Sequence, residues 1–127
     1  MKALSIIFSM MLLLTSLNAA AFTKDAKFRT TKVHITSEKP LGTGSNTFVL
    51  EIKQNGKSLE GSAVSVKAFM PAMPGMPAMQ SKAVATSLGN GKFQVTVNLA
   101  MGGTWQLHIF IAPKTGKKTR VKTSINI

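Results

Sequence analysis

Four methionines recur at every third position of one segment, MPAMPGMPAM, and a proline follows each of the first three. These methionines are Met70, Met73, Met76 and Met79. Proline fixes φ at about −65°, removes a backbone donor and pushes the residue before it toward an extended conformation. We therefore predict a polyproline II conformation, whose threefold period places all four thioethers along one edge.

Thioether sulfur is a soft, uncharged ligand that selects Cu(I) among the common biological metals. In polyproline II the Cα atoms of neighbouring methionines lie about 9 Å apart, so two adjacent side chains can converge on one ion. All four converge only if the loop bends, and a bend costs least at Gly75. Two metal-free interpretations stay open: an apolar loop whose methionines fill gaps over a core, and a peptide-docking surface.

Alternation of apolar and polar residues between turn signals predicts an all-β fold that positions this loop. Asn55-Gly56 marks a tight turn between two of the strands. No stretch beyond residue 21 has a helical period. The seven predicted strands indicate an immunoglobulin-like β-sandwich, and they cover about 28–36, 46–53, 63–69, part of 81–87, 92–100, 105–112 and 120–127.

If each strand crosses the sandwich once, the loops at 38–46, 70–80 and 100–104 share one end. Met101 then lies near the methionine run, and Trp105 lies just inside it, where its ring can cap a bound cation. His34 is the better candidate for a nitrogen ligand, since His108 lies about 13 Å from the turn at about 3.3 Å per residue. Solvated histidines and a core tryptophan are the alternatives.

The first 21 residues have the pattern of a secretory signal. Lys2 precedes an apolar run, and Ala19 and Ala21 form a small-residue cleavage pattern before Phe22. An uncleaved anchor is the alternative, because 3–22 approaches the about 20 residues that span a bilayer. We expect a signal peptide over 1–21 with a signal helix, one domain over 22–127, and a periplasmic location.

The chain has 127 residues, a formal net charge of +12 and no cysteine. Such a charge attracts polyanions, anionic membrane surfaces or acidic proteins, and we expect any membrane contact to be transient. One tryptophan and no run of aromatic residues argue against nucleic acid. Two histidines and four scattered acids, without a nucleophile motif, argue against an enzyme. Without thiols, a soft-metal site needs methionine and histidine, and folding itself requires no cofactor.

Three segments together resemble the YtkA/FixH-like family: FMPAMPGMPAM, GNGKFQVTVNL and MGGTWQLHIFI. The resemblance covers about 40–125. It implies a small extracytoplasmic β-sandwich linked to copper handling, with functional positions at the four methionines of the loop and at Met101 and Trp105. FixH-like members keep a membrane anchor, whereas this start looks cleavable, which favours a free periplasmic carrier.

Two functions follow from these patterns. In the first, the protein holds Cu(I) through the methionine loop, with help from His34, for delivery to a partner or for copper tolerance. The resemblance implies an envelope partner such as an oxidase-assembly factor or a metal-efflux adaptor. In the second, a metal-free interaction module docks its rigid Met-Pro loop into an apolar groove of another envelope protein.

Overall fold

The computed structural model describes residues 21–59, 61–114 and 116–127, and all its regular elements there are β-strands. The all-β prediction is therefore confirmed. The ten strands are β1 (Phe22–Phe28), β2 (Thr31–Ser37), β3 (Gly44–Gln54), β4 (Lys57–Ser58), β5 (Ala63–Met70), β6 (Met79–Val84), β7 (Thr86–Gly89), β8 (Lys92–Leu99), β9 (Thr104–Ala112) and β10 (Thr119–Asn126).

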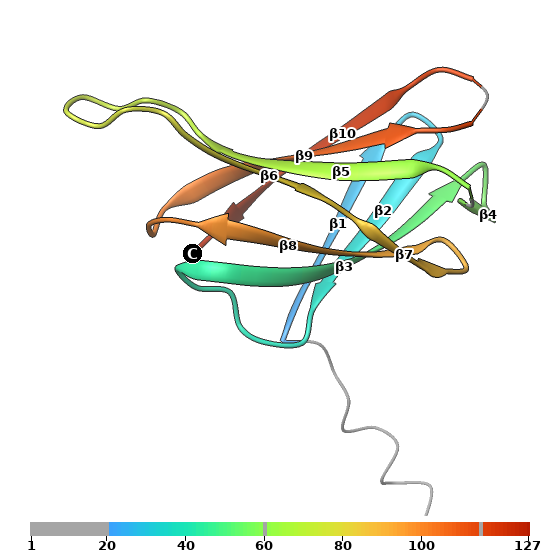
Figure 1. Cartoon of the computed structure of the whole chain (residues 1–127), viewed down its shortest axis with the longest axis horizontal. Coiled ribbons are helices and arrows are strands. Elements are labelled where there is room, and N and C mark those ends of the chain that lie inside the picture. Colours follow the sequence, from blue (N-terminus) through green and yellow to red (C-terminus); the bar gives the residue numbers. More distant parts are fainter. Residues whose placement is uncertain (1–20, 60, 115) are drawn as a thin grey trace, which may run out of the picture.

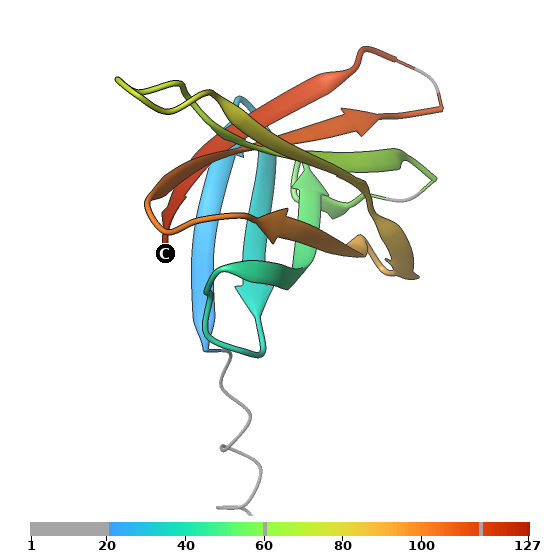
Figure 2. The same cartoon turned by 60° about the vertical axis from the view of Figure 1, so that its left-hand side comes forward.

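The strands form two antiparallel sheets packed as a sandwich (Figure 1). Sheet A has the order β1-β2-β3-β8-β7, with the short β4 also paired to β3. Sheet B has the order β10-β9-β5-β6. From the end of sheet B, the chain between β5 and β6 projects beyond the body of the sandwich (Figures 1 and 2). This projection carries the methionine run.

The core lies between the sheets and is built by period-two alternation. In β8 every second residue is buried, and β9 repeats the pattern from Trp105 to Ile111. Trp105 is the largest of the fully buried side chains. Burial of one such side chain contributes about 1.5–3 kcal/mol to folding, so these alternating residues hold the sandwich together. The predicted inward faces of these two strands are confirmed.

The predicted first strand, 28–36, is wrong in its start. The chain turns at Arg29, whose φ is 54°, so β1 and β2 form a hairpin instead of one strand. The inward positions of β1 include the charged Lys24, whose Nζ donates to the Ser124 carbonyl, which weakens the apolar pattern. Pairing with β2 along seven residues and an edge-on contact between Phe22 and Phe48 hold β1 in place.

The segment after the methionine run also divides. Residues 79–84 pair with β5 in sheet B, and residues 86–89 pair with β8 in sheet A, so the chain changes sheet at Ala85. The Ala85 amide donates to the Val64 carbonyl at this crossing. These divisions, with the short β4, give ten strands in the described residues where seven were predicted.

The predicted signal segment, 1–21, lies outside the described residues except for Ala21, and so does its helix. Within the described ranges, no helix has the length and apolar character needed to span a bilayer.

Candidate metal-binding hairpin

The methionine run is a β-hairpin with a two-residue turn. The Met73 amide donates to the Met76 carbonyl at 3.0 Å, and the Met76 amide donates to the Met73 carbonyl at 2.8 Å. Pro74 and Gly75 occupy the turn, with φ of 80° at Gly75. Proline followed by a residue of positive φ is the signature of a type II turn. The predicted polyproline II conformation is therefore wrong for 73–76, although the bend does lie at Gly75.

The hairpin arranges the four methionines as two cross-strand pairs. Met70 and Met79 are register partners at the base, where β5 and β6 end. Met73 and Met76 are partners at the tip. Directly opposed residues have Cβ atoms about 4.5–5.5 Å apart, which allows the two sulfur atoms of a pair to meet. The two pairs lie about 10 Å apart, from three residues at about 3.3 Å each.

The two pairs differ in access to solvent. Met70 is 3% exposed and belongs to the hydrophobic core, whereas Met73 is 47% exposed. Met76 and Met79 are half-buried. An ion arriving from solvent therefore meets the tip pair first.

Trp105 lies beside the base pair. Phe69 pairs with Gln106, so continuing the register by one residue places Met70 next to Trp105 on the inward face. The indole Nε1 of Trp105 donates to the Met101 carbonyl at 2.9 Å. Trp105 is 1% exposed, so its ring can face only an ion held at the base of the hairpin.

Met101 lies in the turn between β8 and β9, at the same end of the sandwich. It is partly buried against the core, and the Met70 methyl lies close to Gly103 in the same turn. Pairing of Gly44 with Leu99 brings the 38–43 loop to this end as well. The predicted gathering of these three connections at one end is confirmed, and Met70, Met79, Met101 and Trp105 form the base group of the hairpin.

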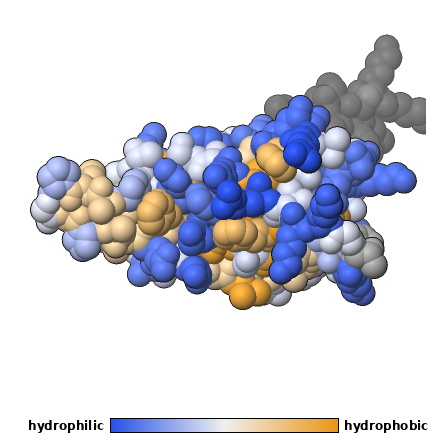
Figure 3. Space-filling model, turned by 90° about the horizontal axis from the view of Figure 1, so that it is seen from above, coloured by the Kyte–Doolittle hydropathy of each residue, from blue (hydrophilic) through white to orange (hydrophobic). Residues whose placement is uncertain are grey.

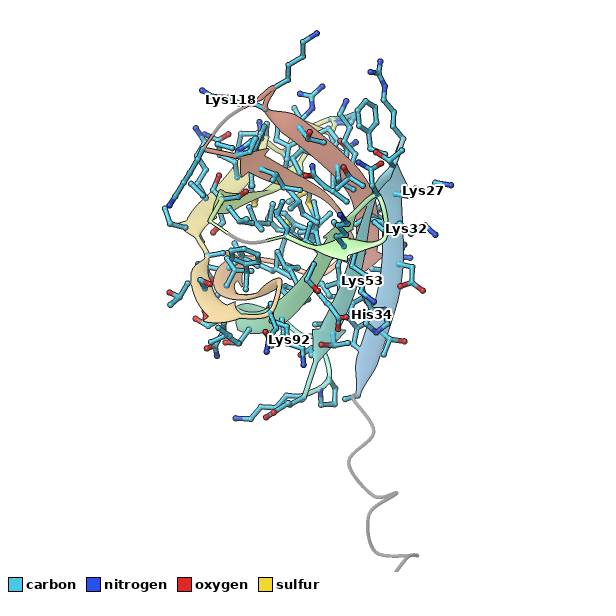
Figure 4. All side chains as sticks on the ribbon, turned by 90° about the vertical axis from the view of Figure 1, so that its right-hand side faces the viewer. Lys27, Lys32, His34, Lys53, Lys92 and Lys118 are labelled. Carbon is cyan, nitrogen blue, oxygen red and sulfur yellow. The ribbon has the colours of Figure 1, made fainter. Side chains whose placement is uncertain are left out.

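His34 lies elsewhere. It is paired with Glu51, and Glu51 lies seven residues from Gly44 along β3, which is about 23 Å at about 3.3 Å per residue. The side chain is exposed on the outer face of sheet A, among Lys27, Lys32 and Lys53 (Figure 4). Its Nδ1 bonds Asp25 Oδ1 at 2.5 Å. The expectation that His34 approaches the methionine end is wrong, because β3 continues well beyond that histidine.

His108 lies on the outer face of sheet B, opposite Lys67 and Lys122. Burial, and then the charges of Lys67, Lys122 and Arg120, lower the pKa of His108 below its usual value. Its Nδ1 is buried and has no hydrogen-bond partner among the described residues. Among the residues that the structure describes, no group of three or more His, Cys, Asp or Glu side chains could hold a metal ion.

The sequence also contains a signal for the hairpin that the triplet repeat concealed. Pro74-Gly75 is itself a turn dipeptide, and the methionines are symmetric about it. Folding at this point pairs Met73 with Met76 and Met70 with Met79.

A family model described as YtkA-like matches residues 25–110, which include the whole hairpin and Trp105. The resemblance seen in the sequence motifs is confirmed by this match. No curated protein and no solved structure matches the chain.

Proposed function

The chain belongs to the YtkA-like family, and from that premise we propose that it binds Cu(I) through the thioethers of its methionine hairpin. The protein carries the ion in the periplasm, for delivery to an envelope partner or for copper tolerance. It is a binding protein and not an enzyme.

One observation carries the proposal: the doubly hydrogen-bonded pairing of Met73 with Met76 at an exposed tip. The turn fixes the two backbones, so two thioethers face one another without further ordering of the chain. Two neutral soft sulfur ligands suit Cu(I) and offer little to hard cations such as Mg²⁺ or Ca²⁺.

The base group offers a second possible position for Cu(I), which is more shielded from water. Met70 and Met79 are opposed there, Met101 lies in the adjoining turn, and the indole of Trp105 is next to Met70. A tryptophan face stabilises a cation by about 0.5–2 kcal/mol, more when water is excluded. Using this position requires the core side chain Met70 to reorient, so we assign first capture to the tip.

Neutral ligands leave the charge of the ion uncompensated on a protein with a net charge of +12. The hairpin therefore holds Cu(I) by soft bonding alone, which favours exchange with a partner's ligands over permanent storage. His34 takes no part in this proposal because of its distance from the hairpin.

Titration with Cu(I) against a competing chelator tests the proposal. The tip variant Met73→Leu/Met76→Leu keeps the apolar volume and removes both sulfur atoms, and such swaps usually cost below about 1.5 kcal/mol. We expect its Cu(I) affinity to fall at least about tenfold, which corresponds to about 1.4 kcal/mol.

The base variant Met70→Leu/Met79→Leu and the variant His34→Gln are the matched controls. The base variant is expected to lose less affinity than the tip variant, and His34→Gln none. Unchanged Cu(I) affinity in a protein with leucine at all four positions would refute the proposal.

The exposed tip also suits the metal-free alternative, in which Met73 enters an apolar groove of a partner. Leucine preserves that contact but not metal binding, so a partner that binds the fourfold leucine variant as tightly as the wild type favours docking.

A further inference from the structure

The outer face of sheet B carries an unbroken row of basic residues. Lys82 pairs with Lys67, Lys67 with His108, and His108 with Lys122, so the row crosses all four strands. Adjacent strands lie about 4.8 Å apart, which makes the row about 14 Å long. Like charges directly opposite one another destabilise a sheet, so the pairing of Lys67 with Lys82 works against folding.

Sheet A also carries a basic row, in which Lys27 pairs with Lys32 and Lys32 with Lys53, but acids lie on the row next to it. There Asp25 pairs with His34, His34 with Glu51, and Glu51 with Lys92, so acids alternate with bases. The strands of sheet B contain no aspartate or glutamate at all. Among the described residues, neither Lys67 nor Lys82 forms a salt bridge.

Apolar groups flank the basic row on both sides. Lys67 Nζ lies 5.6 Å from the Phe69 ring centroid, and His108 packs edge-on against Phe110. A hollow of about 520 Å³ lies beside Lys67 and Lys82, and its lining also includes Val84 and Phe110. Val84 is 81% exposed. Figure 3 looks down on the side where β10, β9 and β5 lie uppermost in Figure 1, and hydrophilic atoms surround separate hydrophobic patches there.

We propose that the outer face of sheet B is a docking surface for an extended acidic segment of a partner protein. Its carboxylates lie along the row from Lys82 to Lys122, and one of its apolar side chains enters the hollow beside Val84. The proposal goes beyond copper binding and stands without it.

The spacing fits such a segment. Alternate residues of an extended chain point to one side and lie about 6.6 Å apart, so carboxylates at three alternate positions span about 13 Å. That length is close to the row's about 14 Å. The hollow beside Lys67 and Lys82, lined by Val84 and Phe110, favours a peptide side chain over a flat layer of lipid headgroups.

Fluorescence anisotropy with labelled decaglutamate tests this surface. The variant Lys67→Gln/Lys122→Gln removes two charges from the row. Two exposed ion pairs at up to about 1 kcal/mol each predict a loss of affinity of up to about thirtyfold. The matched control Lys27→Gln/Lys32→Gln removes two opposed lysines from sheet A, and its affinity is expected to change less than about threefold.

Equal losses in the two variants would overturn the proposal, because net charge alone would then explain the attraction. Binding to phosphatidylglycerol vesicles but not to decaglutamate would overturn it as well, in favour of a lipid surface. The fourfold leucine variant of the hairpin should bind decaglutamate like the wild type, so failure of copper binding and failure of this docking surface are distinguishable.

Discussion

Replacing Lys67 by glutamate should stabilise the fold and weaken the proposed docking of an acidic segment on the outer face of sheet B. Lys67 faces Lys82 directly and has His108 on its other side. Turning one like-charge contact into an opposite-charge contact gains about 0.4–2 kcal/mol, since each cross-strand pair contributes about 0.2–1 kcal/mol in either direction. Loss of the contact between Lys67 and the Phe69 ring costs about 0.5 kcal/mol.

Together these effects should raise the free energy of unfolding of Lys67→Glu by about 1 kcal/mol. In a domain of this size that change raises the melting temperature by about 4 °C. Urea unfolding and thermal melts at low ionic strength measure it. In 1 M salt the screening length falls to about 3 Å, so most of the gain should vanish.

Lys92→Glu is the control variant, for which the expected change in stability has the opposite sign. Lys92 pairs with Glu51 on sheet A, so the same chemical change creates a like-charge contact there and should destabilise by a similar amount. If both variants shift stability in the same direction, or if the gain in Lys67→Glu persists in 1 M salt, charge pairing does not explain the row and the reasoning is refuted.

Three further predictions concern stability. Gly91→Ala should cost at least about 2 kcal/mol in urea unfolding, because φ is 76° and a Cβ would lie 2.9 Å from the Ile52 carbonyl oxygen; a neutral result would contradict that close approach. Trp105→Phe should cost about 2–4 kcal/mol through lost volume and the lost hydrogen bond to Met101, measured in the same way, and a cost below 1 kcal/mol would count against the packed indole. The folded state of His108 has a lowered pKa, so the unfolded chain binds more protons and stability should fall as pH drops below the usual histidine pKa; His108→Gln should flatten this part of the profile, and an unchanged slope would contradict it.

Strong alternation made the central strands predictable. In β8 and β9 every inward position is a large apolar residue, so the period of two clearly predicts β-strands. In β1 the inward positions include Lys24, and its turn into β2 has Arg29 rather than glycine at positive φ. The local sequence contains no strong turn signal for that hairpin, which forms because β1 pairs with β2.

The candidate site was predictable in its residues but not in its geometry. Proline at every third position favours polyproline II, but backbone pairing continued from β5 and β6 folds the segment about Pro74-Gly75. For His34 the error came from strand length. β3 begins at Gly44, two residues before the predicted start at 46, and its residues 44–48 extend past the last pair with β2, which carries the methionine end far from that histidine.

Two residues of the basic row, Lys67 and Lys82, lie on the strands that continue into the methionine hairpin, so the coupling between the row and the hairpin can be estimated. Lys67 and Lys82 lie three residues from Met70 and Met79, which is about 10 Å. In water each charge repels a Cu⁺ ion at that distance by about 0.4 kcal/mol, and by about half as much at the tip.

An acidic segment that neutralises both lysines therefore strengthens Cu(I) binding by at most about 0.8 kcal/mol, or about fourfold, and salt reduces this further. Because coupling between two binding sites is reciprocal, Cu(I) should tighten decaglutamate binding by the same small factor. The proposed docking on sheet B would then position a partner without lowering the affinity for Cu(I). The proposed transfer of Cu(I) then proceeds by exchange of ligands at the exposed pair, Met73 and Met76.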